Sequence, residues 1–394
     1  MTRAFYGWLA GATLSTFGDA TLFFALGWAA SALGPHVTGL VLTGFTLPRA
    51  VLLIAGGVLG DRWGPRRVLL TCYSLLAVLT LLLVLAFNLT GTTATLLLLT
   101  AAVIGTVDAF ALPAAGAFPR LFADDATLPK AMALRTSSQQ VVTLAAGPLG
   151  GLLVAAVGLV GALLVDSVTF LVAFAILLVI KPVFSTQASQ GGSVVRDALD
   201  GIRLAWSEPV IRALLLTVGL TAAFVLPVTS LCVPLLARSQ GWPASQAGLI
   251  VGATVVGSLL VTLVVARGGG FALPGAAAAF GCLVAAGGIA GLALSSVGYA
   301  AVSSAFVQGI GVGLFTSHLA PLFVASTPRS HLTRLQSLLS LAQTLPLVAS
   351  MNLLGGVAST GARGAVLTCA AGTALAGATL LSSRSVRGAV VGVP

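Results

Sequence analysis

Hydrophobic residues lie in long runs along the whole chain, and short polar stretches separate these runs. An apolar run of about 18 residues or more is long enough to cross the ~30 Å hydrocarbon core of a bilayer as an α-helix. The pattern predicts twelve such helices, at residues 5–31, 37–60, 67–88, 92–118, 129–156, 160–181, 210–236, 243–266, 271–296, 299–324, 335–358 and 363–383. We therefore expect an all-α polytopic membrane protein.

The longest polar interval, residues 182–209, divides the predicted helices into six and six. The expected domains are an N-terminal six-helix bundle at 1–181, a cytoplasmic linker at 182–209 and a C-terminal six-helix bundle at 210–394. Within the linker, Val195, Leu199, Ile202 and Trp206 recur at helical spacing, which predicts an amphipathic helix along the membrane surface. The alternative is a plain surface helix without a regulatory role. Two equal halves are expected of a transporter built from a structural repeat.

Composition and charge agree with this assignment. Hydrophobic residues make up 58% of the 394 positions and charged residues 7%, which excludes a soluble protein of this size. The net charge of +10 is scattered between the spans and forms no basic stripe, so nucleic acid is not an expected partner. Fifteen of the nineteen Lys and Arg residues fall on one side of the predicted spans, which places both termini in the cytoplasm.

The sequence gives no indication of a metal, a cofactor or an enzyme. The four cysteines are isolated within apolar runs and are expected to be small buried hydrophobes, because no spacing suggests a metal site or a disulfide framework. No arrangement typical of a nucleophile or a phosphate-binding loop is present. The first apolar run is too long for a cleavable signal peptide. Seventeen Arg against two Lys, with abundant Ala and Gly, indicates a GC-rich bacterial genome and hence a bacterial inner membrane.

A compact charged segment joins the second and third spans and reads Gly57-Val-Leu-Gly-Asp-Arg-Trp-Gly-Pro-Arg-Arg67. It contains Asp61, Arg62, Arg66 and Arg67. A mostly basic connection of this kind stays on the cytoplasmic side.

Three charged residues are predicted near the membrane midplane. At about 1.5 Å per helical residue, Asp19 lies roughly 21 Å from the cytoplasmic edge, and Arg49 and Asp108 each lie roughly 16 Å from it. Such residues cost roughly 2.5–3.5 kcal/mol each in a bilayer, so they need a partner, a water-filled cavity or a function. Either Arg49 pairs permanently with one acid and holds helices together, or one carboxylate exchanges protons while Arg49 tunes its proton affinity. Two acids and one base favour the second alternative, with Asp19 as the first choice.

Other polar residues within the spans have less specific roles. Asp166 falls near the outer end of the sixth span, where a structural role is expected. Gln308 lies near mid-depth in the tenth span and is expected to contact substrate. His318 in the same span is expected to be hydrogen-bonded to its surroundings rather than to carry protons. The last six spans contain no acid, so coupling through a carboxylate must reside in the first half.

The fifth span contains the run Gly147-Pro148-Leu-Gly150-Gly151. Glycines allow close approach between helices and proline bends a helix, so the run predicts a tightly packed, kinked helix.

Several of these segments together resemble the major facilitator superfamily. The spacing from Gly57 through Asp61 to Arg67 is similar to its signature loop between helices two and three. The combination of Ser15-x-x-Gly18-Asp19, Leu47-Pro-Arg49, Ala131-x-Ala-Leu-Arg135 and Asp166-Ser-Val-Thr-Phe170 resembles its bacterial exporter branch, which includes the enterobactin and macrolide efflux proteins. The run at 147–151 is similar to the core of a motif that accompanies antiporters, although Thr143 and Leu134 stand where the longer motif has glycines.

The resemblance implies a fold of two six-helix bundles, in which helices one, four, seven and ten line a central cavity. Asp19, Asp108 and Gln308 would then face the cavity, and Asp166 would lie outside it. Asp61 would act as a latch on a neighbouring helix end or basic residue, with Gly57 and Gly64 permitting close approach, and Arg62, Arg66 and Arg67 would fix the loop at the membrane surface. The alternative is that the loop only determines topology. The equivalent joint in the second half, Ala266-Arg-Gly-Gly-Gly-Phe271, lacks an acid.

The function implied is proton antiport with alternating access, which exports a small organic compound such as a drug, a secondary metabolite or a siderophore. The expected partners are this compound, protons and the lipid bilayer, and the protein is expected to be monomeric. Two alternatives stay open: an uptake symporter or facilitator of the same fold, and a receptor or assembly factor that does not transport.

Overall fold

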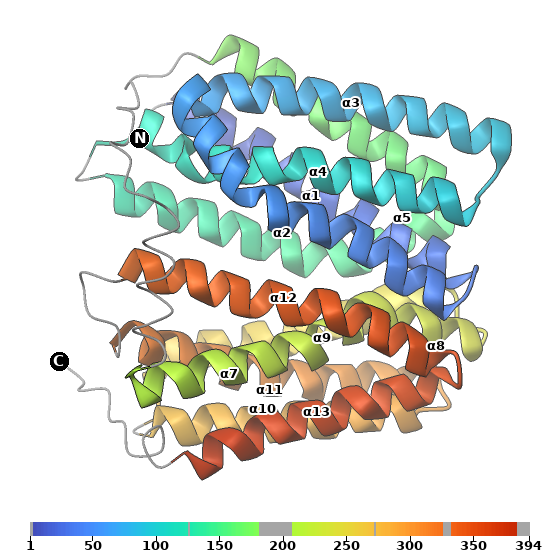
Figure 1. Cartoon of the computed structure of the whole chain (residues 1–394), viewed down its shortest axis with the longest axis vertical. Coiled ribbons are helices and arrows are strands. Elements are labelled where there is room, and N and C mark those ends of the chain that lie inside the picture. Colours follow the sequence, from blue (N-terminus) through green and yellow to red (C-terminus); the bar gives the residue numbers. More distant parts are fainter. Residues whose placement is uncertain (1–2, 125–126, 181–206, 272, 326–331, 384–394) are drawn as a thin grey trace. The chain divides into compact units, whose positions relative to one another are not determined.

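The computed structural model describes residues 3–124, 127–180, 207–271, 273–325 and 332–383, and within these ranges it is helical, with no strand (Figure 1). The helices are α1 (Arg3–Ser31), α2 (Pro35–Trp63), α3 (Pro65–Thr90), α4 (Ala94–Ala117), η1 (Phe118–Leu121), α5 (Leu128–Val179), α7 (Pro209–Phe224), η2 (Val228–Cys232), α8 (Val233–Ser239), α9 (Ala244–Gly268), α10 (Pro274–Leu294), α11 (Gly298–Ala325), α12 (Leu332–Ala358) and α13 (Ala362–Ser382). The predicted amphipathic helix at 195–206 lies outside these ranges.

The described helices include eleven stretches that are long and apolar enough to cross a membrane. One of them belongs to α5, whose 52 residues would extend about 78 Å as a straight helix, more than twice the thickness of the hydrocarbon core. Gly158 interrupts α5 with non-helical angles, φ 65° and ψ −166°. Because this break separates α5 into two spans, the twelve predicted helices are all present, and the prediction of an all-α polytopic membrane protein is confirmed.

The joint between α2 and α3 is shorter than the sequence suggested. Helix α2 continues to Trp63 and α3 begins at Pro65, so Gly64 alone makes the turn. Its φ of 79° is readily adopted only by glycine, and proline is well suited to the first position of a helix because it lacks the N–H that would be unpaired there. The predicted loop at 57–67 is therefore mostly helical.

The chain forms two compact units, residues 1–190 with 243–248, and residues 191–242 with 249–394. The core of the first unit gathers buried side chains of α1, α3, α4 and α5, among them Trp8, Leu26, Leu76 and Phe170. In the second unit, Leu214 of α7, Ala279 of α10 and Phe323 of α11 pack together.

Both units bring two of their helices into backbone contact through glycine. In the first, a Cβ on Gly56 of α2 would collide with the carbonyl oxygen of Ala109 on α4, and a Cβ on Gly105 would collide with that of Phe45. In the second, Gly309 of α11 faces the carbonyl oxygen of Thr254 on α9 in the same way. Small residues allow such approach where lipid supplies no hydrophobic force between helices. The pairs α2–α4 and α9–α11 are the second and fourth spans of each half, so the contact recurs as a structural repeat.

A polar cap precedes α5. Asp124 accepts hydrogen bonds from the Thr127 hydroxyl at 2.6 Å and from the Thr127 backbone N–H at 2.9 Å. These bonds, of which the hydroxyl's has the larger effect, hold the pKa of the exposed Asp124 carboxyl below its usual range. The cap therefore stabilises the folded protein at pH values above the carboxyl's unfolded-state pKa. This stabilisation is lost as the pH falls through the lower pKa of the folded state.

Candidate functional site

The three predicted midplane charges meet inside the first unit. Asp19 of α1 lies near enough to Asp108 of α4 and to Arg49 of α2 for their charges to act on it, and Arg49 also acts on Asp108. Asp108 is buried and Asp19 and Arg49 are half-buried. Three residues far apart in the sequence thus share one electrostatic site.

Arg49 is not locked to either acid. Its guanidinium carbon lies 5.2 Å from the centre of the Phe45 ring, a cation–π contact. Among the described residues it makes no ion pair within 4.0 Å. One oxygen of Asp19 and one of Asp108 are buried without a hydrogen-bond partner in the same part of the chain. This conformation does not have the permanent pair that a purely structural role for Arg49 requires.

Asp166 joins the same site, which the sequence did not indicate. Its side chain is fully buried, and both carboxyl oxygens lack a hydrogen-bond partner within the described ranges. A Cβ on Gly18 would collide with one of these oxygens, so the missing side chain at Gly18 makes room for Asp166 beside α1. The charge of Asp166 acts on Asp19. We call Asp19, Arg49, Asp108 and Asp166 the charge cluster; it holds three acids and one base.

The signature segment contains an observed helix-end contact. The Arg66 guanidinium donates hydrogen bonds to the carbonyl oxygens of Leu177 at 2.8 Å and Leu178 at 3.2 Å. These carbonyls belong to the last turn of α5, where backbone oxygens lack helical partners and the helix dipole favours a cation. Arg66 therefore ties the start of α3 to the end of α5.

Replacing Arg66 by Gln is expected to destabilise the first unit by roughly 1.5–3 kcal/mol, the range for hydrogen bonds to charged groups. Arg67→Gln, at the exposed neighbouring position, is the matched control and should change stability little. Thermal unfolding of the purified protein in detergent measures both. Equal effects of the two substitutions would show that the contact between Arg66 and the end of α5 does not stabilise the unit.

The other residues of the signature segment have different surroundings. A Cβ on Gly57 would meet nothing within 4 Å, so its close approach stays a prediction; the glycine in backbone contact is Gly56, one residue earlier. Gly64 likewise is required by its φ rather than by a neighbour. Arg62 is exposed. The side chain of Asp61 lies outside the described part of the structure, so its latch role stays a prediction.

The run at 147–151 packs closely. A Cβ on Gly151 would lie 2.7 Å from the Cα of Gly248, a residue that belongs to the first unit, and a Cβ on Gly248 would lie 2.6 Å from the carbonyl oxygen of Gly147. Gly150 faces Thr21 of α1 at an ordinary contact distance of 3.5 Å. Helix α5 remains helical through Pro148, and its non-helical residue is Gly158.

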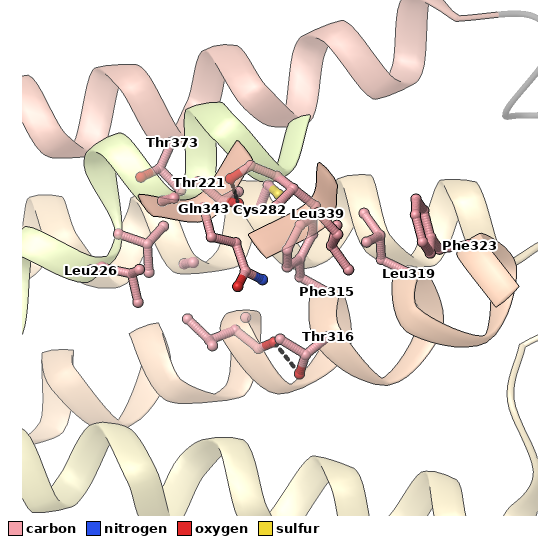
Figure 2. Close-up of a pocket in the computed structure, with 16 residues that line it drawn as sticks. Thr221, Leu226, Cys282, Phe315, Thr316, Leu319, Phe323, Leu339, Gln343 and Thr373 are labelled. Atoms are coloured by element: carbon pink, nitrogen blue, oxygen red, sulfur yellow. Dashed lines mark hydrogen bonds between the residues drawn. The ribbon is translucent and has the colours of Figure 1, made fainter. Parts of the chain in front are cut away.

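The second unit contains a pocket of about 400 Å³. Helices α7, α10, α11, α12 and α13 line it (Figure 2). Its walls are mainly apolar, and they include Val218, Leu226, Phe315, Leu319, Phe323 and Leu339. No charged side chain is among the described residues that line it.

Four side chains give the pocket its polarity. The hydroxyls of Thr221, Thr316 and Thr373 donate to carbonyl oxygens of their own helices, so their oxygen lone pairs are what they offer to a ligand. Gln343 of α12 adds an amide, which Figure 2 shows directed into the space between Leu226 and Phe315. An amide both donates and accepts. The pocket therefore suits an uncharged, mostly apolar molecule with a few hydrogen-bonding groups.

Gln308, predicted to contact substrate, does not line this pocket. It is 1% exposed, and neither end of its amide has a partner among the described residues. A Cβ on Gly288 of α10 would collide with the Gln308 backbone, so this part of α11 packs directly against α10. The pocket amide comes instead from Gln343, which the sequence analysis missed because the apolar pattern of α12 does not reveal its inward face.

His318 and the four cysteines lie outside the charge cluster, and their contacts are also seen. His318 is hydrogen-bonded at both ring nitrogens, as predicted for a structural histidine. All four cysteines are buried, and the sulfurs of Cys232 and Cys369 lie 3.8 Å apart, a proximity that their spacing of 137 residues does not indicate.

Twelve spans in two halves, with a charge cluster among the spans and an apolar pocket, are typical of polytopic helical transporters. The Major Facilitator Superfamily model matches residues 8–302, and the chain belongs to this family. The structure is similar to a bacterial homologue of the human lysosomal transporter Spinster (TM-score 0.75, 15% identity, covering 98% of each chain). It is also similar to the nucleoside transporter NupG (0.74, 12%, 98% of this chain and 100% of that one) and to a bacterial homologue of the iron transporter ferroportin (0.73, 16%, 98% and 99%).

These identities are too low to indicate more than a shared fold. A comparison with curated proteins gave no match. Family membership indicates a multi-pass membrane transporter of small molecules rather than an enzyme.

Proposed function

We propose that this protein is a secondary active transporter that exports a small organic compound by proton antiport with alternating access. In this proposal it lies in a bacterial inner membrane with both termini in the cytoplasm. Residues 1–181 carry the proton chemistry, and residues 210–394 carry much of the substrate pocket.

The observation that carries the proposal is the composition of the charge cluster. The cluster holds three carboxyl groups and one guanidinium, whose charge acts on Asp19 and Asp108 and which lies over Phe45 rather than in an ion pair. Buried carboxylates that lack a fixed counter-charge bind protons readily, and changing hydration alters that binding. Alternating access would supply the change, because it exposes the cluster to each side in turn.

The pocket supports an organic substrate. Its apolar walls favour burial of hydrocarbon surface, and a charged ligand would have to give up its hydration without gaining a counter-charge there. A volume of about 400 Å³ falls within the range of drug-sized ligand sites. We therefore propose an uncharged, largely apolar substrate, which agrees better with a drug or secondary metabolite than with a charged siderophore.

The direction of transport follows from the resemblance to the exporter branch and from the run at 147–151. Tight packing at Gly151 and Gly248 supports the comparison with the antiporter motif, since only glycine permits it. Uptake by symport is the competing direction.

Substrate-driven proton flux in proteoliposomes tests the proposal. A panel of uncharged antibiotics, with organic cations of equal size for comparison, is added outside vesicles that contain a pH-sensitive dye. At least one uncharged compound should drive protons in the opposite direction to itself, and Gln343→Leu should weaken its apparent affinity. Proton movement in the same direction as the compound would establish symport, and binding without flux would indicate a receptor.

The charge balance makes a quantitative prediction. Exchange of an uncharged compound for protons moves net positive charge, so the membrane potential should drive it. Each proton gains about 2.3 kcal/mol per 100 mV, which corresponds to a roughly 50-fold change in the equilibrium accumulation of substrate. An imposed potassium diffusion potential measures this, and one-for-one exchange against a monovalent cation would show no such dependence.

A further inference from the structure

The loop between α9 and α10 occupies, in the second half, the place that the α2–α3 joint occupies in the first. It contains Gly269, Gly270 and Phe271 but no acid, so the sequence predicts no latch there. The structure nevertheless holds the first part of this loop, at Gly270 and Phe271. The contact comes from His318, seven residues before the end of α11.

Three contacts hold the loop to the imidazole. The backbone N–H of Phe271 donates to Nε2 of His318 at 3.1 Å. The Phe271 ring stacks on the imidazole with centres 5.2 Å apart and planes inclined by 25°. A Cβ on Gly270 would lie 3.6 Å from the imidazole, so the backbone of the loop passes close to the ring.

One neutral form of the ring satisfies all of these contacts. Nε2 must accept the Phe271 N–H, so the ring proton is on Nδ1, which lies 2.8 Å from the carbonyl oxygen of Leu314. Protonation would place a hydrogen on Nε2, where it would face the Phe271 N–H, and two donors cannot bond to each other. The hydrogen bond from the loop therefore exists only while the imidazole is neutral.

We propose that His318 is a positioning residue whose neutral ring clamps the α9–α10 loop to α11 and whose protonation releases it. Helix α11 also supplies Phe315, Thr316 and Leu319 to the pocket (Figure 2), so the clamp joins the loop to the helix that forms part of the pocket wall. In the orientation given under Proposed function, the loop lies on the cytoplasmic side and responds to cytoplasmic pH. That sidedness rests on the proposed function, but the clamp itself does not.

The described groups around His318 carry no charge that could break the hydrogen bond from Phe271, so protonation of His318 itself is the change that would break it. The groups in contact with the ring, at Gly270, Phe271 and Leu314, are uncharged. The adjacent helices bring no acid: α9 carries Arg267 in its last turn, α10 carries Cys282, and α11 carries Tyr299 besides His318.

The same kind of joint is held differently in the two halves. In the first, the permanently charged Arg66 binds the carbonyl oxygens at the end of α5. In the second, a titratable ring binds a backbone N–H of the loop. The first contact uses a guanidinium as the donor, whereas the second requires a neutral ring nitrogen as the acceptor.

Hydrogen exchange at the Phe271 amide tests the clamp, because this amide is the donor in question. Exchange is measured on the full-length protein at about pH 7.5 and about pH 5 and corrected for the intrinsic rate. The wild type should show protection at the higher pH that falls by about tenfold or more at the lower one, which reflects local opening. His318→Gln retains an acceptor that does not titrate, so protection should persist at both pH values. His318→Leu should lose it at both.

Two results would overturn the proposal: equal protection of the wild-type amide at both pH values, or retained protection in His318→Leu. Amides of α9 around Thr254 serve as the internal control for folding. Since no substrate is needed, a failure of this test can be distinguished from a failure of proton antiport. If the clamp and proton antiport are both confirmed, the antiport rate of His318→Gln should lose the pH dependence that comes from release of the loop. The number of protons exchanged per substrate molecule should stay unchanged.

Discussion

Asp19→Asn is expected to reduce proton-coupled exchange to the level of protein-free vesicles. The substitution keeps the size of the side chain and its hydrogen-bonding capacity but removes the group that binds a proton. Asp19 is the member of the charge cluster on which the charges of Asp108, Asp166 and Arg49 all act, so its occupancy by a proton depends most on the state of the others. Substrate-driven proton flux in proteoliposomes is the measurement.

The controls separate loss of coupling from loss of folding. Substrate counterflow, which needs no proton gradient, should persist in Asp19→Asn, because the pocket lies in the other unit. Asp108→Asn should also impair coupling, because Asp108 shares the influence of Arg49. Asp124→Asn, at the exposed cap of α5, should leave flux unchanged. Full proton-coupled exchange in both cluster variants would show that the coupling site lies elsewhere.

Gly309→Ala is expected to destabilise the second unit strongly. The new methyl group would collide with the carbonyl oxygen of Thr254, and backbone atoms cannot yield as a flexible side chain can. Overpacking of this kind costs roughly 1–3 kcal/mol and exceeds the gain of up to about 1 kcal/mol from replacing glycine within a helix. Thermal unfolding in detergent should therefore show a lower midpoint.

Gly287→Ala provides the matched comparison. A Cβ at Gly287 of α10 would meet nothing within 4 Å, so only the helix propensity changes and the midpoint should stay or rise. Gly105→Ala should behave like Gly309→Ala, because its Cβ would collide with the Phe45 carbonyl oxygen in the first unit. Similar midpoints for Gly309→Ala and Gly287→Ala would contradict the backbone contact between α9 and α11.

The spans were predictable because the bilayer imposes a minimum length of apolar helix, and that requirement is visible in the sequence. The charge cluster was partly predictable for a related reason. Asp19, Arg49 and Asp108 stand out in apolar surroundings, and counting residues along each helix places them at a similar depth. Depth alone could not show that Asp166 reaches the same place, because that depends on how α5 packs against Gly18 of α1.

The remaining contacts depend on helix rotation, for which the sequence offers little information. In a soluble protein the apolar stripe of a helix shows which face is buried. In this chain most helices are apolar on all sides, because lipid and protein neighbours are both apolar, so the pattern does not distinguish the two. Gln308 and Gln343 illustrate this: both interrupt apolar helices, and only Gln343 lines the pocket.

The sequence by itself determined that this chain crosses a membrane twelve times and that its ionisable groups concentrate in the first half, because both follow from composition and spacing along the chain. Tertiary structure decided which of those groups meet. It placed Asp166 beside Asp19, tied Arg66 to the end of α5, and set His318 against a loop that has no charged residue to hold it. Each of these contacts joins segments distant in sequence, and their geometry comes from helix packing and glycine contacts that no local pattern specifies.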